Sequence, residues 1–540
     1  MNAHTTHPTH PRQEGKSTMA PAELVTYTPV WEAADPAPVA GPVPLTARDV
    51  LLVVDGADHG RAWAPGSVRP VRVGLDVDAD PAAWTAFLAG LRAAGRGPRA
   101  LVFDLPAATT RPERAMELVR PALQALLAGS ADGPEGGPEG GQLAGSEGGP
   151  LPVAFLVTGR ARPELAPVLG SLAQAAAAGE RGLRPVCVRV ETVPAGAGDP
   201  LAVALAELSA ATLPGLAEVR YADAGRQVRV LRRRERRTAA SGRRPVFHDG
   251  GRYLITGGTT GTGLRLASLL AREHRARLVL TGEQDPDAEQ QAAFRRMERA
   301  GASVTFVRAK LSRPADALAA VAAAQRESGG LDGVLHCAGG PLDEAIQLDR
   351  ATASLPLGFF VLLSSASAWF GTPGSATGRA LGALAAARAQ LGETGARQGA
   401  SVAVAWPSWA PEPDVREVAA RDDVRDDVRD DVRDDVRDDV RDDVRDDVRD
   451  DVRDDAFDGE PVPVPGELDG MLAMPADVAL RALADAVRGW DTELVTAYGD
   501  ARGIDASIGR LCAERPAPLA PAAAAGRPPL GLHAAARTAA

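Results

Sequence analysis

The sequence predicts an α/β protein of two doubly wound units, with disordered tails and a charged repeat inserted into the second unit. Short apolar runs alternate with amphipathic stretches along most of the 540 residues, a pattern typical of parallel strands joined by helices. Apolar residues make up 45% of the chain and aromatic residues only 4%, so aliphatic side chains must fill most of the interior. The length favours two or more domains over a single core.

The expected boundaries follow changes in composition. Stretches rich in Gly, Pro and Ala, or in charge, separate segments that carry the alternating pattern. In chain order we expect a disordered tail at 1–22, a structural Rossmann-like unit at 23–245 with a flexible loop at 129–150, a second Rossmann-like unit at 246–500 with an insert at 412–460, and a mostly disordered tail at 501–540.

The first unit has no loop suited to phosphate. Its first expected strand, 49–55, leads into the turn Gly56–Gly60, which acidic residues flank. Negative charge there opposes phosphate binding, so we interpret this unit as a structural module rather than a second nucleotide site. Further expected elements are strands at 71–77 and 100–105, helices at 81–94, 111–128 and 165–178, and a hairpin formed by EVRY and VRVL.

Composition excludes several function classes. The net charge of −11 comes mostly from one acidic repeat, and no basic surface suggests nucleic acid. Cys187, Cys337 and Cys512 are too far apart for a disulfide framework or a metal motif. No apolar stretch approaches the length of a membrane span, and the N-terminus lacks the apolar segment of a secretory signal. We therefore expect a cytoplasmic protein that binds neither nucleic acid nor membrane.

The strongest local signal is a glycine-rich turn between a strand and a helix. The apolar run Tyr253–Thr256 leads into Gly257, Gly258, Thr259, Thr260, Gly261, Thr262 and Gly263, and a helix with an apolar face follows. Glycines let the backbone approach a pyrophosphate, and the helix start offers free amides. The expected dinucleotide-binding residues here are Thr256, Gly257, Gly258, Thr259, Gly261 and Gly263. The alternative is a turn kept for packing after cofactor binding was lost.

Four motifs in this order resemble the short-chain dehydrogenase/reductase superfamily, and more narrowly the ketoreductase domain of modular type I polyketide synthases. They are TGGTTGTG at 256–263, HCAG at 336–339, LLSSASAWFGTPG at 362–374 and AVAWPSWA at 403–410. The resemblance implies a structural subdomain that YTPVW at 27–31 opens, a catalytic-type subdomain, and NADPH-dependent reduction of a β-ketoacyl group on an acyl carrier protein. It adds Ala338 and Gly339 to the expected cofactor-binding residues.

The resemblance also shows what is missing. Ser365 matches the serine that binds the substrate carbonyl, but Gly378 stands at the general-acid tyrosine and Gly382 at the asparagine four residues later. The connection at 342–358 is short by about a helix and lacks the family's lysine, although LDE at 342–344 resembles its stereochemical Leu-Asp-Asp marker. Without a positioned acid, reduction loses roughly 10²–10⁴-fold in rate. The alternative for Ser365 is an ordinary strand-end hydroxyl.

The cofactor site departs from the family at two further positions. Glu283 and Gln284 stand where the family has arginines for the 2′-phosphate of NADPH, and Lys310 replaces its adenine-binding aspartate. A carboxylate repels phosphate but accepts a ribose hydroxyl, as in NAD-binding proteins. The resemblance implies NADP(H), and these two positions leave NAD(H) or no cofactor open.

The acidic repeat lies where the family has a mobile lid. RDDV occurs eight times from Arg421 to Val452, and RDDA at 453–456 completes the run. Valines four residues apart drift around a helix and form no lasting apolar stripe. We interpret the run as a recently expanded tandem repeat, either disordered or a lone charged helix. A calcium site is disfavoured because the run has no glycine turns.

Three functions remain open. The leading hypothesis is a degenerate ketoreductase acting as a scaffold or interaction part of polyketide biosynthesis, with synthase subunits or an acyl carrier protein as partners in trans. The second is an active NAD(P)H-dependent β-ketoacyl reductase with an unrecognised acid. The third is a dinucleotide-sensing regulatory protein. No metal is expected in any of them.

Overall fold

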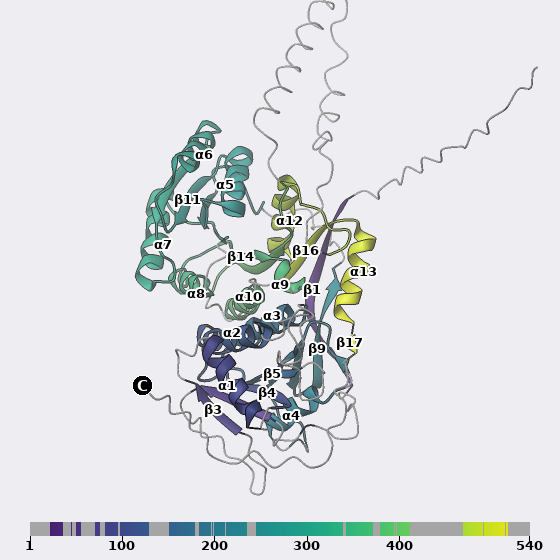
Figure 1. Cartoon of the computed structure of the whole chain (residues 1–540). Helices are drawn as coiled ribbons and strands as arrows, with labels where there is room; N and C mark the ends of the chain where they lie inside the picture. Colours follow the sequence, from purple (N-terminus) through teal and green to yellow (C-terminus); the bar gives the residue numbers. More distant parts are fainter. Residues whose placement is uncertain are drawn as a thin grey trace, which may run out of the picture.

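The computed structural model describes two lobes that share one sheet (Figure 1). It describes residues 22–35, 45, 50–55, 71–75, 81–94, 98–128, 151–178, 183–195, 197, 199–210, 212–234, 245–337, 342–370, 378–393, 395, 397–410, 468–489, 491–513 and 515–516. Within these residues fifteen strands form the sheet, in the order β12-β11-β10-β13-β14-β15-β16-β1-β9-β8-β6-β5-β4-β2-β3. The fold class predicted from the sequence, α/β with two Rossmann-like halves, is confirmed.

The C-terminal lobe is a parallel sheet with helices on both faces. Buried apolar side chains of α5 and α12 cover one face, and those of α7, α8 and α10 cover the other. Its elements are β10 (Arg252–Thr256), α5 (Gly261–His274), β11 (Arg277–Gly282), α6 (Ala288–Arg299), β12 (Ser303–Arg308), α7 (Pro314–Ser328), β13 (Gly333–His336), α8 (Leu342–Ala351), β14 (Phe359–Ser365), α9 (Ser367–Phe370), α10 (Gly378–Glu393), β15 (Ala400–Trp406), α12 (Ala476–Arg488) and β16 (Glu493–Gly499).

The N-terminal lobe repeats this plan on a smaller scale. Helices α1, α2 and α3 pack on one face of its sheet and α4 on the other. Its elements are β2 (Val50–Asp55), β3 (Val71–Leu75), α1 (Pro81–Ala93), β4 (Ala100–Pro106), α2 (Pro112–Ala128), β5 (Leu151–Thr158), α3 (Leu165–Ala178), β6 (Leu183–Val190), α4 (Pro200–Leu208), β7 (Thr212–Leu213), β8 (Glu218–Ala222) and β9 (Gly225–Arg233). The expected hairpin is β8 and β9, which pair antiparallel.

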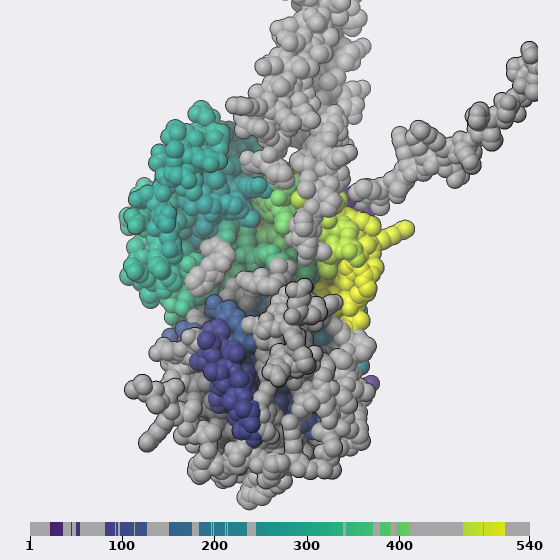
Figure 2. All heavy atoms as spheres, in the orientation of Figure 1, coloured from purple at the N-terminus to yellow at the C-terminus, as the bar shows by residue number. Residues whose placement is uncertain are grey.

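Strand β1 (Glu23–Ala33) joins the lobes. It pairs antiparallel with β16 through Glu23–Tyr27 and with β9 through Tyr27–Ala33. On one side of the sheet α3 and α10 also pack together between the lobes, since Val168 belongs to the same apolar cluster as α10 (Figure 1). The space-filling view shows the teal C-terminal lobe seated on the purple and blue helices of the N-terminal lobe (Figure 2).

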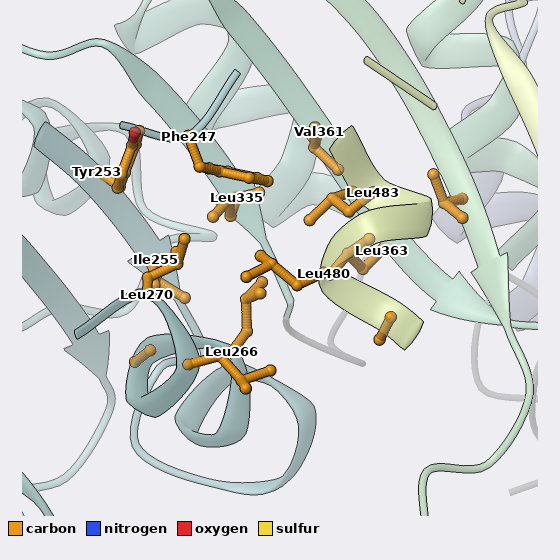
Figure 3. Close-up of a cluster of buried hydrophobic side chains, with 14 of the residues drawn as sticks. Phe247, Tyr253, Ile255, Leu266, Leu270, Leu335, Val361, Leu363, Leu480 and Leu483 are labelled. Carbon is orange, nitrogen blue, oxygen red and sulfur yellow. The ribbon is translucent and has the colours of Figure 1, made fainter. Parts of the chain in front are cut away.

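The strand and the helix on either side of the glycine-rich turn contribute side chains to the largest apolar cluster of the C-terminal lobe (Figure 3). Leu266 and Leu270 of α5 meet Leu480 and Leu483 of α12 over the aliphatic side chains of the central strands. All four leucines are almost fully buried. Because burying a leucine stabilises a fold by about 1.5–3 kcal/mol, this contact holds α5 against α12.

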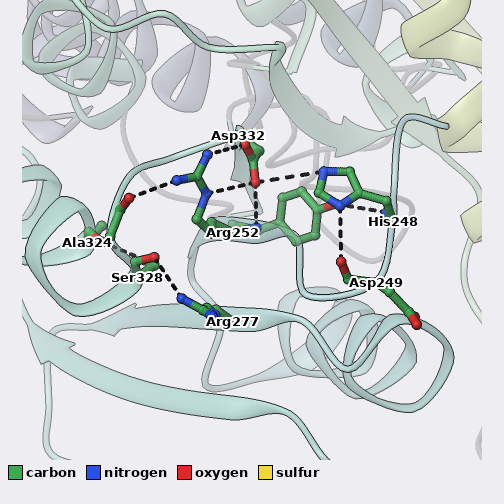
Figure 4. Close-up of polar contacts among 9 residues, drawn as sticks. His248, Asp249, Arg252, Arg277, Ala324, Ser328 and Asp332 are labelled. Atoms are coloured by element: carbon green, nitrogen blue, oxygen red, sulfur yellow. Dashed lines mark hydrogen bonds and ion pairs between the residues drawn. The ribbon is translucent and has the colours of Figure 1, made fainter. Parts of the chain in front are cut away.

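The amino ends of β10 and β13 lie at the edge of the sheet opposite the glycine-rich turn. Ion pairs and hydrogen bonds join these two ends (Figure 4). The Arg252 guanidinium donates to both carboxylate oxygens of Asp332, at 3.0 and 2.6 Å, and to the carbonyl oxygen of Gly329 at 2.8 Å. These hydrogen bonds hold the pKa of Asp332 below its ordinary value. The adjacent strands β10 and β13 are thereby aligned at the end remote from the turn.

One boundary needs correction. The expected tail at 501–540 begins with a packed helix, α13 (Ala501–Cys512), which buries Ile504 and Ile508 and is capped by the Asp500 side chain. The short strand β17 (Arg515–Pro516) follows and pairs with β7. The polar residues around these two isoleucines hid the apolar face of the helix. Several predicted features lie outside the described residues: positions 1–21 of the first tail, the turn Gly56–Gly60, the loop at 129–150, the insert at 412–460 with its RDDV repeat, and positions 517–540 of the second tail.

Within the described residues, no helix is both long enough and apolar enough to cross a membrane.

Candidate functional site

The turn between β10 and α5 has the geometry of a phosphate cradle. Gly257 and Gly261 adopt positive φ angles of 65° and 50°, which glycine reaches without strain. A Cβ on Gly263 would lie 2.2 Å from the carbonyl oxygen of Gly257, and one on Gly258 would lie 2.8 Å from that of Ile255. Any side chain at Gly258 or Gly263 would clash with the backbone of the turn, so only glycine fits at these two positions.

The first turn of α5 is open to a ligand. Thr260 precedes the helix in an extended conformation, and its side chain makes no capping hydrogen bond. The first amides of a helix have no intrahelical acceptor and carry partial positive charge. They are therefore available to an anion seated on the glycine-rich turn.

Beneath the turn lies a buried threonine–histidine pair. Thr256 Oγ1 and His336 Nδ1 are 2.7 Å apart, at the ends of β10 and β13. Burial lowers the pKa of His336 to about 4, so its imidazole is neutral near pH 7. The Cys337 amide donates to the Thr256 carbonyl at 3.0 Å. Ala338 and Gly339, expected to contact the cofactor, lie outside the described residues.

Charged side chains gather beyond β11 and β12, where a dinucleotide's adenosine end would lie. Glu283 follows β11, and its carbonyl oxygen accepts a hydrogen bond of 3.1 Å from Arg308 Nε. On α8, burial and the nearby Glu283 charge raise the pKa of Glu344, while Lys310 opposes that shift. The charges of Glu283 and Lys310 therefore both act on the Glu344 carboxyl.

Ser365 stands at the carboxyl end of β14, as the sequence predicted. Its Oγ is 2.6 Å from Ser367 Oγ and also accepts from the Ser367 amide at 3.2 Å. Gly378 is the first residue of α10, and residues 371–377 before it lie outside the described residues. The structure therefore places Ser365 at the end of its strand and Gly378, expected at the family's tyrosine position, at the start of α10.

Arg379, next to Gly378, reaches across the lobe junction to Glu218 on β8. It is 1% exposed and donates to Glu218 Oε1 at 2.5 Å and to the Ala368 carbonyl at 3.0 Å. Gly382 also faces a carboxylate, since a Cβ there would lie 2.0 Å from the Glu493 carboxyl carbon. Sequence reasoning missed Glu218 and Glu493 because both are distant along the chain and neither lies in a motif.

The chain's four tyrosines are engaged elsewhere. Tyr27 OH donates to Asp505, Tyr221 OH donates to Glu207, Tyr253 OH accepts from the His248 amide, and Tyr498 lies on β16 where burial and the Asp477 charge raise its pKa. The chain has two lysines, and the described one, Lys310, follows β12, four strands from β14. At about 4.8 Å per strand that separation is roughly 19 Å. Neither a phenol nor an ammonium among the described residues contacts Ser365.

Among the residues with described positions, no group of three or more His, Cys, Asp or Glu side chains could hold a metal ion.

Comparison with known proteins finds a family match over the part of the chain that holds the glycine-rich turn. Residues 251–347 match the sequence model of the family described as KR domain. The chain is 34% identical over 234 residues to polyketide synthase ThaG of Burkholderia thailandensis, covering 37% of this chain and 4% of ThaG. It is 29% identical over 188 residues to polyketide synthase PksL of Bacillus subtilis, covering 30% of this chain and 4% of PksL. The chain thus spans less than a tenth of the length of these two relatives.

Solved structures extend the likeness over nearly the whole chain. "Structure of A-type Ketoreductases from Modular Polyketide Synthase" is 25% identical with a TM-score of 0.59, covering 88% of this chain and 93% of that one. A ketoreductase domain from the bacillaene assembly line, 16% identical with a TM-score of 0.56, covers 90% of this chain and all of that one. The chain therefore has a ketoreductase-type short-chain dehydrogenase/reductase fold. More narrowly, residues 251–347 are similar to KR domains, and the fold is similar to that of ketoreductases from polyketide synthases.

Proposed function

We propose that the chain binds a nicotinamide dinucleotide on the glycine-rich turn but does not reduce ketones, and that it serves polyketide biosynthesis as a scaffold or interaction part. The observation that carries this proposal is the burial of Arg379. The side chain beside the vacant tyrosine position is bound to Glu218 and to main-chain carbonyls, so it cannot turn toward Ser365.

The expected cofactor-binding residues fit the dinucleotide. Gly258 and Gly263 allow the tight turn on which a pyrophosphate would rest, and the uncapped start of α5 would supply amides for its oxygens. A bound nicotinamide would supply hydride. Glu283 at the ribose end would accept a hydroxyl and repel a 2′-phosphate, which favours NADH over NADPH.

Among the described residues, no group completes a reduction at Ser365. Ser365 can donate one hydrogen bond to a carbonyl oxygen, but a hydride transfer also needs a proton from a positioned acid. A guanidinium with a pKa above about 12 is a poor acid even where it is free. The charge developing on the carbonyl oxygen would therefore be left without compensation.

The test is a fluorescence titration of the intact chain with NADH and NADPH, followed by turnover of a β-ketoacyl thioester. We expect NADH to bind more tightly than NADPH, with no consumption above the rate without protein. Gly378→Tyr alone should leave that rate unchanged, because the family's lysine position stays empty. Rapid consumption by the wild-type chain would refute the inactive assignment, and the absence of any dinucleotide binding would refute the cofactor part.

One observation favours a dinucleotide-sensing protein as the second candidate. The turn from Gly257 to Gly263 has the tight glycine geometry that dinucleotide binding would use, whereas Gly378 and Gly382 offer no side chain for catalysis. Partner binding that changes with NADH concentration, measured with an acyl carrier protein or a synthase subunit, would separate sensing from a constant scaffold.

A further inference from the structure

The contact between α8 and α10 contains a buried arginine. These two helices lie side by side on one face of the C-terminal sheet (Figure 1). Arg388 of α10 is 1% exposed, and its guanidinium carbon lies 4.2 Å from the ring centroid of Phe360, near the start of β14. Its Nη1 donates to Oδ1 of Asp349 on α8. The guanidinium of Arg388 is therefore held between an aromatic ring and one carboxylate.

One edge of this guanidinium has no hydrogen-bond acceptor. Nε and Nη2 of Arg388 are both buried, and neither has a hydrogen-bond partner among the described residues. The N–H bonds of these two atoms point the same way, so the edge matches the two oxygens of one carboxylate or phosphate group. A buried donor on a charged group is costly to leave unsatisfied. The edge therefore has both the geometry and the energetic reason to bind an oxyanion.

Other arginines of the chain hold a carboxylate with this same edge. Arg252 donates from Nε and Nη2 to Asp332, at 3.0 and 2.6 Å. Arg226 donates from the same two atoms to Glu207, at 2.7 and 3.0 Å, and this pair is nearly as enclosed as Arg388. Among the described residues, only Arg388 leaves both atoms of the edge buried and without an acceptor. The chain itself thus shows which chemical group the edge accepts.

Asp349 is already shared between two guanidinium groups. Arg397, which follows α10, donates from its own Nε and Nη2 to the two oxygens of Asp349, each at 3.3 Å. Both oxygens of Asp349 are thus engaged by Arg397, and one of them also accepts from Nη1 of Arg388. Burial lowers the pKa of Arg388, and the Arg397 charge adds to this effect while Asp349 opposes it. A second negative group at this contact would compensate the charge of Arg388.

We propose that the Nε–Nη2 edge of Arg388 binds the carboxylate or phosphate group of a small anion, in a site enclosed between α8 and α10. Because both donor atoms are buried, the site suits a small molecule and excludes a bulky partner. The side chains of Asp349 and Arg397 are 14% and 16% exposed, so solvent reaches the contact beside them. A bound anion would join α10 more firmly to α8.

This site is separate from Ser365 and from the glycine-rich turn. Phe360, which contacts Arg388, lies near the amino end of β14, and Ser365 ends that strand five residues later, roughly 17 Å away. The glycine-rich turn lies at the same carboxyl edge of the parallel strands as Ser365. An anion at Arg388 would therefore bind near the opposite edge, independently of a dinucleotide.

The experiment measures the thermal unfolding midpoint of the full chain in sodium chloride, sodium acetate and sodium phosphate, at one pH and one ionic strength. Acetate and phosphate present two oxygens to the edge, whereas chloride is a single atom. At saturating acetate or phosphate the midpoint, relative to chloride, should rise by about 2 °C more in the wild type than in Arg388→Met. General effects of these salts, and any anion on the glycine-rich turn, act on both chains alike, so the difference reports Arg388.

Two further variants sharpen the test. Arg388→Lys keeps a positive charge but has no paired edge, so the anion concentration at half of the shift should rise by about tenfold. The matched control is Arg481→Met on α12, which removes an arginine whose side chain is 67% exposed. This control should keep the full wild-type shift.

The site would be refuted by equal shifts in the wild type and Arg388→Met, or by a wild-type midpoint that is the same in all three salts. A shift that Arg388→Lys keeps in full would refute the paired edge. If neither Arg388 variant folds, amide hydrogen exchange of the wild type decides. Slower exchange of residues 342–351 and 379–389 in acetate or phosphate than in chloride supports the site, and unchanged exchange there refutes it.

Discussion

Two segments of the C-terminal lobe follow central strands, β10 and β14, that have β13 between them, yet the two segments have different characters. The turn after β10 keeps its open backbone, with Gly257 and Gly261 at positive φ and no side chain closing the start of α5. Helix α10, reached from β14 through α9, has turned its first residues into the lobe junction, where Arg379 and Gly382 meet Glu218 and Glu493. A phosphate cradle needs only backbone and space, whereas acid catalysis needs particular side chains, so one can persist where the other is absent.

The largest expected effect tests whether α10 is now structural. Arg379→Met should lower the free energy of unfolding by about 3–5 kcal/mol, because it leaves the Glu218 carboxylate buried without its partner. Urea denaturation measures the change. The exposed i,i+4 pair of Arg481 and Asp477 provides the control, and Arg481→Met should cost at most about 0.5 kcal/mol.

Adding Glu218→Gln to Arg379→Met removes the uncompensated charge, so the double variant should lose less than the two single losses combined. A loss below about 1 kcal/mol in Arg379→Met would mean that α10 does not depend on this ion pair.

The next effect concerns the cradle. Gly263→Ala places a methyl group against the Gly257 carbonyl and should weaken NADH binding by roughly 3 kcal/mol, or about 100-fold. Isothermal titration measures it. Gly90→Ala on α1, where a Cβ meets nothing within 4 Å, should leave binding unchanged and stabilise the chain by about 1 kcal/mol. Equal affinity in Gly263→Ala would show that dinucleotide, if bound, does not use this turn.

The smallest effect concerns the acidic repeat. Residues on both sides of it are held by one bridge, in which the Ala410 amide donates to Met474 and the Met474 amide donates to Ser408. Deleting residues 421–456 should therefore change the free energy of unfolding by only about 1 kcal/mol, in the stabilising direction expected for a shorter connection. Differential scanning calorimetry tests this, and a large loss of stability would show that the repeat packs on the lobes.

The sequence was sufficient for features that depend on neighbours along the chain. The order of elements, the turn from Gly257 to Gly263 and the position of Ser365 all follow from local pattern and motif. The interactions of Arg379 could not be predicted, because Glu218 lies 161 residues away and Glu493 is brought in by a different strand. Nor did the alternating pattern predict that β1 would merge two Rossmann-like units into one sheet, since strand pairing across such separations leaves no periodic signal.

The position of β1 has a consequence for synthesis and truncation. This strand is made before both of its partners, since β9 appears about 200 residues later and β16 more than 460 residues later. Until the last partner emerges from the ribosome, the nascent N-terminal lobe exposes unpaired amide and carbonyl groups along one strand, a surface prone to association with other chains. A fragment that starts beyond Ala33 would leave β9 and β16 as two open edges, so expression of either lobe alone should call for β1 to be retained with it.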